Sequence, residues 1–133
     1  METFALKIVT PDGCIFDGRA QKLFCRTICG DVGILPRHSD YCTALGMGDA
    51  HIYFEDGTVR HAACIGGMLS VLKGDVHLMA TTWEWAEEID KERAEASRAR
   101  AEKILAQKNL DARELEMAQA RLKRALVRSS VAK

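Results

Sequence analysis

Three cysteines and a histidine lie close together in the first third of the chain and could in principle hold a metal ion. They are Cys25, Cys29, His38 and Cys42. Thiolates and imidazoles are the ligands that zinc prefers. However, the spacing C-x3-C-x8-H-x3-C does not match a standard zinc motif. Cys14 and Cys64 lie outside it, so the chain also uses cysteine as a small apolar residue. We therefore expect no metal site from this group.

Nucleophilic catalysis is a second chemistry that these residue types allow. The chain has five cysteines and four histidines, enough for a Cys–His pair. It has no nucleophile elbow, no Walker A loop and no Rossmann glycine fingerprint. His51, His61 and His77 fall in β-forming runs, where we expect them on the surface of a sheet. We expect no catalytic residues and a chain that is not itself an enzyme.

Arginines at helical spacing in the last third of the chain are a third candidate site. Asp90, Arg93 and Arg100 share one helix face, and Arg124 and Arg128 share another. Arginine stays charged and bonds phosphate through two N–H groups, so guanidinium groups on two neighbouring helices could bind a polyphosphate. An ordinary surface ion pair and a solvated helix end explain the same spacing. The residues alone favour this second explanation.

The elements that would carry these side chains change in type near residue 81. Glycine-containing turns recur up to Gly74 and separate β-forming runs such as 50–54 and 76–80. This pattern predicts an antiparallel β-sandwich of about ten short strands over residues 1–82. No glycine or proline follows Gly74, and Thr81 with Glu84 has the spacing of a capping box. We therefore expect a first helix from about Trp83 to about Lys108.

A second helix is predicted after a break at Asn109. Asp111 has the position and type of its N-cap. The short connection predicts an antiparallel helical hairpin over residues 83–133. The predicted buried stripe of the second helix is Leu115, Ala118, Leu122, Ala125 and Ser129. An interface so rich in alanine buries little apolar area, so we expect the hairpin to need another surface, a ligand or a partner.

Composition narrows the class of protein. The formal net charge is zero, which implies no bulk attraction to nucleic acid. No run of 18 apolar residues is present, and the first residues lack the features of a signal peptide. An odd number of cysteines without secretory context favours reduced thiols in a cytoplasm. We expect a chain that binds no nucleic acid and does not insert directly into a membrane.

One loop stands out among the predicted strands. Residues 30–38 read GDVGILPRH, in which two glycines and a proline frame the apolar pair Ile34 and Leu35. Glycine permits close backbone approach and proline fixes φ, so the segment should be rigid. It is either a contact loop or a turn that plugs the end of the sandwich.

Four segments in order carry a resemblance to a known family. They are FALKIVTPDG at 4–13, GDVGILPRH at 30–38, IGGML at 65–69 and IDKERA at 89–94. Together they resemble the epsilon subunit of bacterial F-type ATP synthase, and the resemblance covers nearly the whole chain. It implies a rotor subunit of the central stalk whose β-sandwich binds the gamma subunit and the membrane rotor ring of c subunits. It also implies a peripheral position on the cytoplasmic face of the cell membrane, with catalysis in the alpha and beta subunits.

The resemblance further implies two sets of functional residues. Its rotor-ring contact residues are Asp31, Ile34 and His38. Its ATP-binding residues are Ile89, Asp90, Arg93 and Ala94 on the first helix and Arg124 and Arg128 on the second, with Glu84 and Arg100 at plausible offsets outside the core motif. ATP would be a regulatory ligand, and no cofactor is required. The helices would contact the alpha/beta head and inhibit ATP hydrolysis when extended.

The sequence also allows two alternative hypotheses for the function of the chain. One is a stand-alone β-sandwich that binds a ligand and dimerises through its helical hairpin. The other is a small metal-dependent regulator that uses its cysteines. Neither the coupling ion nor the strength of inhibition follows from the sequence.

Overall fold

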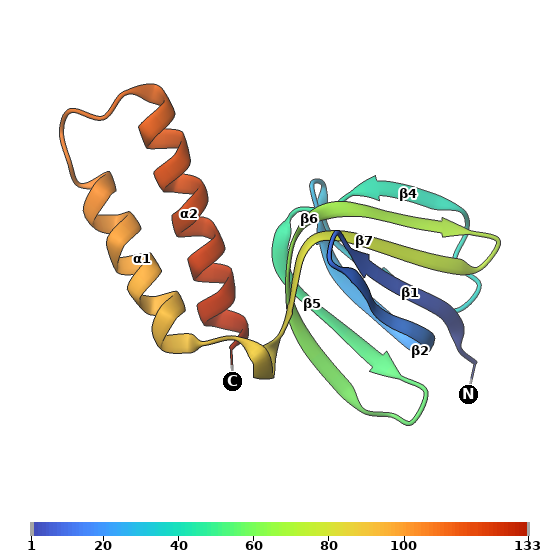
Figure 1. Cartoon of the computed structure of the whole chain (residues 1–133). Coiled ribbons are helices and arrows are strands. Elements are labelled where there is room, and N and C mark those ends of the chain that lie inside the picture. Colours follow the sequence, from blue (N-terminus) through green and yellow to red (C-terminus); the bar gives the residue numbers. More distant parts are fainter. Residues whose placement is uncertain (1, 133) are drawn as a thin grey trace. The chain divides into compact units, whose positions relative to one another are not determined.

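The computed structural model describes residues 2–132 and divides the chain into two compact units (Figure 1). The first is Met1–Trp85 and the second is Ala86–Lys133. The division falls three residues beyond the predicted boundary, and each unit is described by itself.

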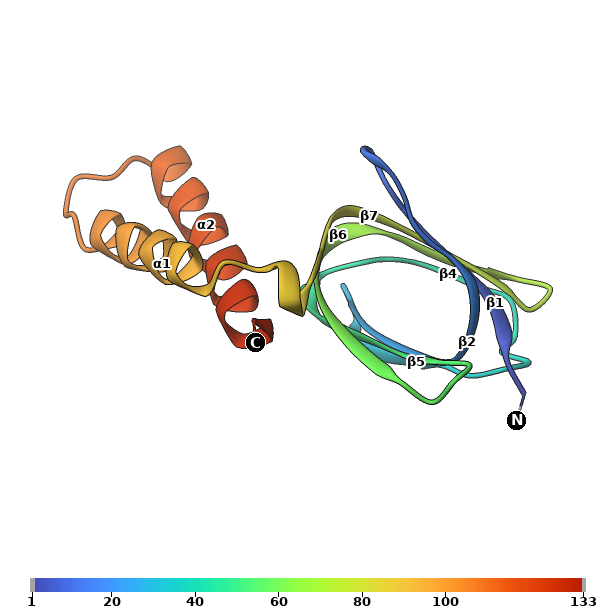
Figure 2. The same ribbon diagram turned by 60° about the horizontal axis from the view of Figure 1, so that its bottom comes forward.

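Within the described residues, the first unit is a β-sandwich of seven strands. They are β1 (Phe4–Thr10), β2 (Gly13–Thr27), β3 (Gly30–Ile34), β4 (Tyr41–Ala44), β5 (Met47–Phe54), β6 (Val59–Leu72) and β7 (Asp75–Trp85). The order is β1-β7-β6-β5-β2-β3, with β4 on β6 and a further pairing between β1 and β2. That further pairing closes β1, β7, β6, β5 and β2 into a ring around the core (Figure 2). The β1–β7 pairing is parallel and the others are antiparallel.

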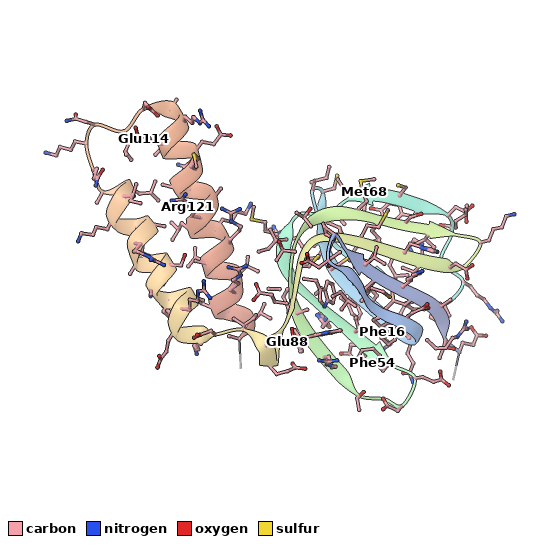
Figure 3. All side chains as sticks on the ribbon, viewed as in Figure 1. Phe16, Phe54, Met68, Glu88, Glu114 and Arg121 are labelled. Carbon is pink, nitrogen blue, oxygen red and sulfur yellow. The ribbon has the colours of Figure 1, made fainter. Side chains whose placement is uncertain are left out.

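The core of the sandwich comes from side chains that alternate inward along these strands. The largest fully buried ones are Leu6, Ile8, Leu23, Ile34, Ile52, Leu69, Leu78 and Val76. Phe16 and Phe54 pack edge to face with their ring centroids 5.1 Å apart (Figure 3). This unit therefore has a hydrophobic core of its own.

The prediction of about ten short strands was wrong in number, because some glycines mark corners inside long strands. Gly66 and Gly67 have φ of 70° and 119° and lie within β6. Before them β6 pairs with β5 as far as Ile65, and after them it pairs with β4 from Met68 onward. The glycine pair thus lets one strand pass from one neighbour to another instead of ending it.

The predicted start of the first helix was also wrong. Residues 81–85 continue β7, in which Trp83 and Trp85 alternate into the core. The Thr81–Glu84 pattern is therefore not a capping box, because cross-strand pairing with β6 takes precedence over the local signal. A short 3-10 turn, η1 (Ala86–Glu88), follows β7.

The second unit consists of the helices α1 (Lys91–Leu105) and α2 (Ala112–Val131). They run antiparallel as a hairpin, as predicted (Figure 1). The Asp111 side chain caps α2 by accepting a hydrogen bond from the N–H of Glu114, which confirms the predicted cap. No helix within residues 2–132 is long and apolar enough to cross a membrane.

Alanine dominates the buried face of the hairpin. Ala94 and Ala101 on α1, and Ala118 and Ala125 on α2, are buried at a spacing of seven residues on each helix. Leu115, predicted in the buried stripe, is 40% exposed. Small side chains let the helices approach closely but bury little apolar area per residue.

Candidate functional site

The predicted contact loop is partly a strand. Gly30–Ile34 forms β3, which pairs with β2. Ile34 lies opposite Leu23 and is 0% exposed, whereas Leu35 is 49% exposed. The expectation that Ile34 offers a contact surface is thus not met in this conformation, because the strand turns its side chain into the core. Leu35 is the exposed member of the apolar pair.

The other end of β3 exposes an isoleucine that the sequence analysis missed. Ile28, in the turn between β2 and β3, is 70% exposed. Asp31, three residues further along, is exposed and has a carboxylate oxygen 3.6 Å from the Arg26 guanidinium. A large apolar residue in a turn of otherwise small and polar residues was the signal that could have identified this position.

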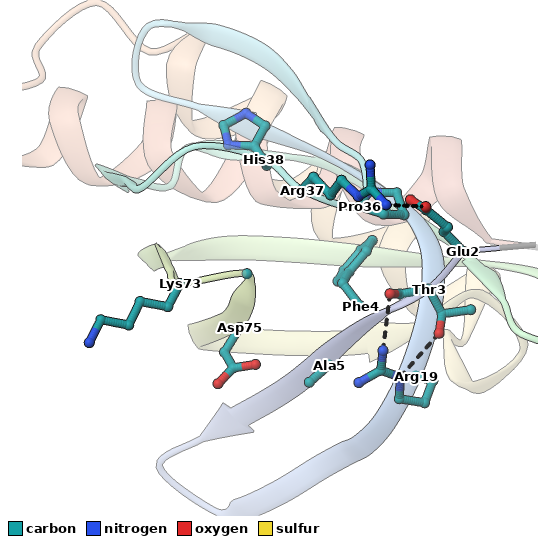
Figure 4. Close-up of a pocket in the computed structure, with 11 residues that line it drawn as sticks. Glu2, Thr3, Phe4, Ala5, Arg19, Pro36, Arg37, His38, Lys73 and Asp75 are labelled. Carbon is teal, nitrogen blue, oxygen red and sulfur yellow. Dashed lines mark hydrogen bonds and ion pairs between the residues drawn. The ribbon is translucent and has the colours of Figure 1, made fainter.

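His38 lines a cavity of about 640 Å³ at one end of the sandwich (Figure 4). Arg37 pairs there with Glu2 at 2.8 Å, and Arg19 donates to the carbonyl of Thr3 at 3.0 Å. The His38 imidazole bonds the carbonyl of the neighbouring Ser39 at 2.7 Å. Asp31 lies near the start of β3 and His38 follows its C-terminal end, so the predicted contact residues are spread along this segment and do not form one cluster.

The cysteine group does not assemble into a metal site. Cys25 is buried while Cys29 and Cys42 are exposed, and the thiols are free. Burial, with a smaller contribution from the Asp31 charge, raises the pKa of Cys25 to about 12. A thiol held in its protonated form is a poor zinc ligand.

The predicted ATP motif forms the start of α1. Asp90 is its N-cap, and its carboxylate accepts a hydrogen bond from the backbone N–H of Arg93 at 3.1 Å. Ile89 and Ala94 are buried, and Arg93 is exposed. The aspartate and the two apolar residues of the motif thus have structural roles of their own, and Arg93 is the member free to meet a ligand.

The hairpin contains a cavity of about 330 Å³ with two arginines. Its lining includes Arg100 from α1, together with Ser97, Ala101 and Ile104. Arg121 from α2 also lines it (Figure 3). Arg100 is a predicted site residue, but Arg121 is not, because it falls outside the family motif. Arg98, by contrast, is engaged by Glu95 at 2.7 Å.

The remaining predicted residues do not line this cavity. Arg124 is exposed on α2 and Arg128 is half-buried on the same helix. Glu84 lies on β7 in the sandwich unit, opposite Ala63 on β6.

Two family profiles match the chain, one for each unit. The profile described as ATP synthase, Delta/Epsilon chain, beta-sandwich domain matches residues 3–86, and that of the long alpha-helix domain matches residues 87–133. The chain belongs to the ATP synthase delta/epsilon family. This confirms the family and the fold class to which the four sequence segments pointed.

Curated bacterial members of the delta/epsilon family match the chain along its length. An ATP synthase epsilon chain from Exiguobacterium is 36% identical over 98% of this chain and 96% of its own. One from Ruminococcus albus is 38% identical over 99% of this chain and 98% of its own. A third, from Acetobacterium woodii and named as sodium ion specific, is 33% identical over 71% of each chain.

Solved structures share the fold of this family member. A chain of the Euglena gracilis mitochondrial ATP synthase superposes with a TM-score of 0.82 at 21% identity, covering 91% of this chain and 76% of that one. A chain of the Tetrahymena thermophila mitochondrial ATP synthase, from a structure of its central stalk and c ring, gives 0.66 at 15% identity, covering 99% and 98%.

Proposed function

We propose that this chain is a central-stalk subunit of a bacterial F-type ATP synthase and joins the gamma subunit to the membrane rotor ring. One observation carries the proposal: both family domains match in order from residue 3 to residue 133. As such a subunit the chain would be a peripheral protein on the cytoplasmic face of the membrane. It would be non-catalytic, with ATP made and hydrolysed in the alpha and beta subunits.

The surface proposed to contact the rotor ring consists of Ile28, Asp31, Leu35 and His38. Ile28 precedes β3 and Leu35 follows it, and both are large exposed apolar side chains. Leu35 replaces the buried Ile34 of the sequence prediction. Asp31 and His38 add polar groups along the same segment. Exposed apolar side chains at the two ends of a strand can add apolar contact area to a protein interface.

The helices are proposed to regulate ATP hydrolysis by leaving the hairpin and reaching the alpha/beta head. The alanine interface supports this proposal, because separating the helices exposes methyl groups and few large side chains. Leu115, Met117 and Leu126 are already exposed on α2 and offer apolar contacts to a partner.

ATP is proposed to stabilise the hairpin as a regulatory ligand. Arg100 and Arg121 from different helices line one cavity, and phosphate would relieve the repulsion between their charges. Asp90 is occupied as the helix cap, so the arginines, including Arg93, would supply the phosphate contacts. At 100 times its dissociation constant a ligand stabilises its bound state by about 2.7 kcal/mol, enough to close a marginal hairpin.

Association with the gamma subunit tests the stalk assignment. The full chain and a gamma subunit from a close bacterial relative are co-expressed, and a tag on one of them is used for purification. A stable 1:1 complex is expected, and a homodimer of this chain without gamma would instead support the ligand-binding module. Within the complex, Leu35→Lys should weaken retention of the rotor ring, whereas Leu72→Lys, at an exposed leucine on β6, should not.

Titration calorimetry of the full chain with ATP tests the ligand assignment. Arg100→Ala and Arg121→Ala should each weaken binding about 10- to 150-fold, since a charge-assisted hydrogen bond contributes about 1.5–3 kcal/mol. Arg93→Ala and Arg124→Ala test the residues that only the family motif implies. Lys103→Ala, an exposed cation on α1, is the matched control. Equal affinity in all variants, or no heat at millimolar ATP, would reject the site.

Removal of the helices tests regulation. The truncation belongs after Glu88, because a cut within β7 would remove Trp83 and Trp85 from the core. The truncated subunit should still assemble, and ATP hydrolysis by the complex should stay equal or rise. Loss of assembly would mean that the helices are structural and not regulatory.

A further inference from the structure

An aspartate and two histidines meet on the outer face of the sandwich. Asp49 and His51 are two residues apart on β5 and so point to the same side of the sheet. His61 on β6 is the direct cross-strand partner of His51. One ligand atom from each of the three residues lies within 4.8 Å of the others, and residues 2–132 contain no other such group of three.

We propose that Asp49, His51 and His61 bind a divalent transition cation of the zinc class. Zinc–ligand bonds of about 2.1 Å place the ligand atoms of a tetrahedral site roughly 3.4 Å apart. The His61 Nδ1 is already 3.2 Å from a carboxylate oxygen of Asp49, and the His51 Nδ1 is 3.7 Å from the same oxygen. Because an ion lies in the plane of each imidazole that binds it, the His61 ring must also turn out of its stack with His51 before both can bind one ion.

Neighbouring rings hold the central ligand in place. The His51 ring stacks on Phe24 with centroids 4.8 Å apart and an interplanar angle of 20°. Its other stacking partner is His61, at 5.0 Å and 27°. A ligand fixed by packing loses little rotational freedom when the ion binds.

The His51 Nδ1 lacks an interaction that a bound cation would provide. This nitrogen is buried and has no hydrogen-bond partner within the described chain. Buried polar atoms are nearly always satisfied, so one without a partner calls for an explanation. A cation between His51 and Asp49 would supply the missing interaction.

The site is accessible, and its ligands are selective. The side chains of Asp49, His51 and His61 are 44%, 29% and 42% exposed, which leaves room for an ion to enter and for water to complete its coordination. Two imidazoles and one carboxylate suit zinc, copper and nickel, whereas Mg²⁺ and Ca²⁺ prefer oxygen ligands. Cations on β2 and β6 are engaged elsewhere: Lys22 lies over the Tyr53 ring, Arg26 pairs with Asp31, and Arg60 lies over the Trp85 ring.

The test is a titration of the full reduced chain with Zn²⁺, followed by NMR of the histidine imidazoles. The signals of His51 and His61 should move and saturate at one ion per chain, while His38 and His77 serve as internal references. Asp49→Asn and His61→Ala should each weaken binding at least tenfold, a loss that even the partners of metal ligands produce when removed. His77→Ala, an exposed histidine on β7, should bind as the parent does.

The exposed cysteines require a separate control experiment, because thiolates also bind zinc. Co²⁺ in place of Zn²⁺ reports its ligands, and the proposed site should give a spectrum without thiolate-to-cobalt charge transfer. A thermal melt of each variant establishes that it is folded. Unmoved His51 and His61 signals at saturating Zn²⁺, an unchanged affinity in folded His61→Ala, or a thiolate spectrum at one equivalent would each overturn the proposal. Mg²⁺ at millimolar concentration should leave both signals in place.

Discussion

Replacing Gly67 by alanine should strongly destabilise the β-sandwich. A Cβ at this position would lie 1.9 Å from the carbonyl oxygen of Met79 and 2.9 Å from the Cα of Ala80. Both atoms belong to the backbone of β7, so no side-chain rotation relieves the clash. Gly67 also has φ of 119°, which L side chains rarely adopt.

The size of the effect follows from the displacement required. Restoring a separation of 3.0 Å from 1.9 Å moves β6 and β7 apart by about 1.1 Å at this point. An N–H···O bond stretched by this amount is lost. Two lost bonds at about 1 kcal/mol each and about 1–3 kcal/mol of backbone strain give a loss of about 3–5 kcal/mol in the free energy of unfolding.

Gly74→Ala is the matched control, because Gly74 also has a positive φ, 84°, but a Cβ there meets nothing within 4 Å. Gly74→Ala should lower the free energy of unfolding only by the backbone strain, about 1–3 kcal/mol. Thermal unfolding followed by tryptophan fluorescence reports on the sandwich alone, since Trp83 and Trp85 are the two tryptophans of the chain. At about 4–8 °C per kcal/mol, Gly67→Ala should melt at least about 8 °C below Gly74→Ala. Equal melting temperatures would refute the argument from close strand approach.

Four further predictions concern titratable and capping groups. Burial raises the pKa of both Cys25 and Cys64 to about 12, so a disulfide reagent at pH 8 should modify the three exposed cysteines rapidly and these two only on unfolding; five fast thiols would contradict this. Because these folded-state pKa values are raised, their contribution to stability is present below the ordinary thiol pKa and is lost as the pH rises toward 12, so denaturant midpoints should fall above about pH 9. Hydrogen bonds from the Thr58 hydroxyl and N–H lower the pKa of Asp56, so its contribution is present above the carboxyl's ordinary value and is lost as the pH falls through the lowered one. Asp56→Asn should therefore flatten the acid limb of the stability curve, and an unchanged limb would rule this out. Asp90→Ala should cost α1 about 1 kcal/mol through loss of its N-cap, seen as reduced helicity by circular dichroism, with Glu92→Ala as the control that should retain it.

Features that depend only on residues close together in the sequence could be predicted from the sequence. The change from a sheet to helices, the hairpin and the Asp111 cap all follow from local patterns. The β-forming run at 76–80 was predicted, but its continuation to residue 85 was not, because Thr81 and Glu84 have the spacing of a cap and only pairing with β6 reveals a strand. The same holds for Gly66 and Gly67, which resemble a turn until both partners of β6 are known.

Among the candidate-site residues, those in a local motif could be predicted from the sequence, and those brought together by packing or strand register could not. The family motif located Asp90 and Arg93, but it could not show that the aspartate caps a helix. Arg121 joins Arg100 only through the packing of two helices, which no motif encodes. His51 and His61 are ten residues apart in the sequence, and their meeting depends on the register of β5 against β6.

The closed ring of strands has a consequence for how the chain folds. β1 is synthesised first, but it lies between β2 and β7, and its parallel partners are residues 76–79. The ring therefore cannot close until almost the whole sandwich has left the ribosome. Until then β1 and β6 each present an unpaired edge, which is the state most open to wrong partners. The helical hairpin makes mainly local contacts, so its folding does not depend on a distant segment that is synthesised later. We expect the later-synthesised half of the protein to acquire its structure at least as fast as the earlier one.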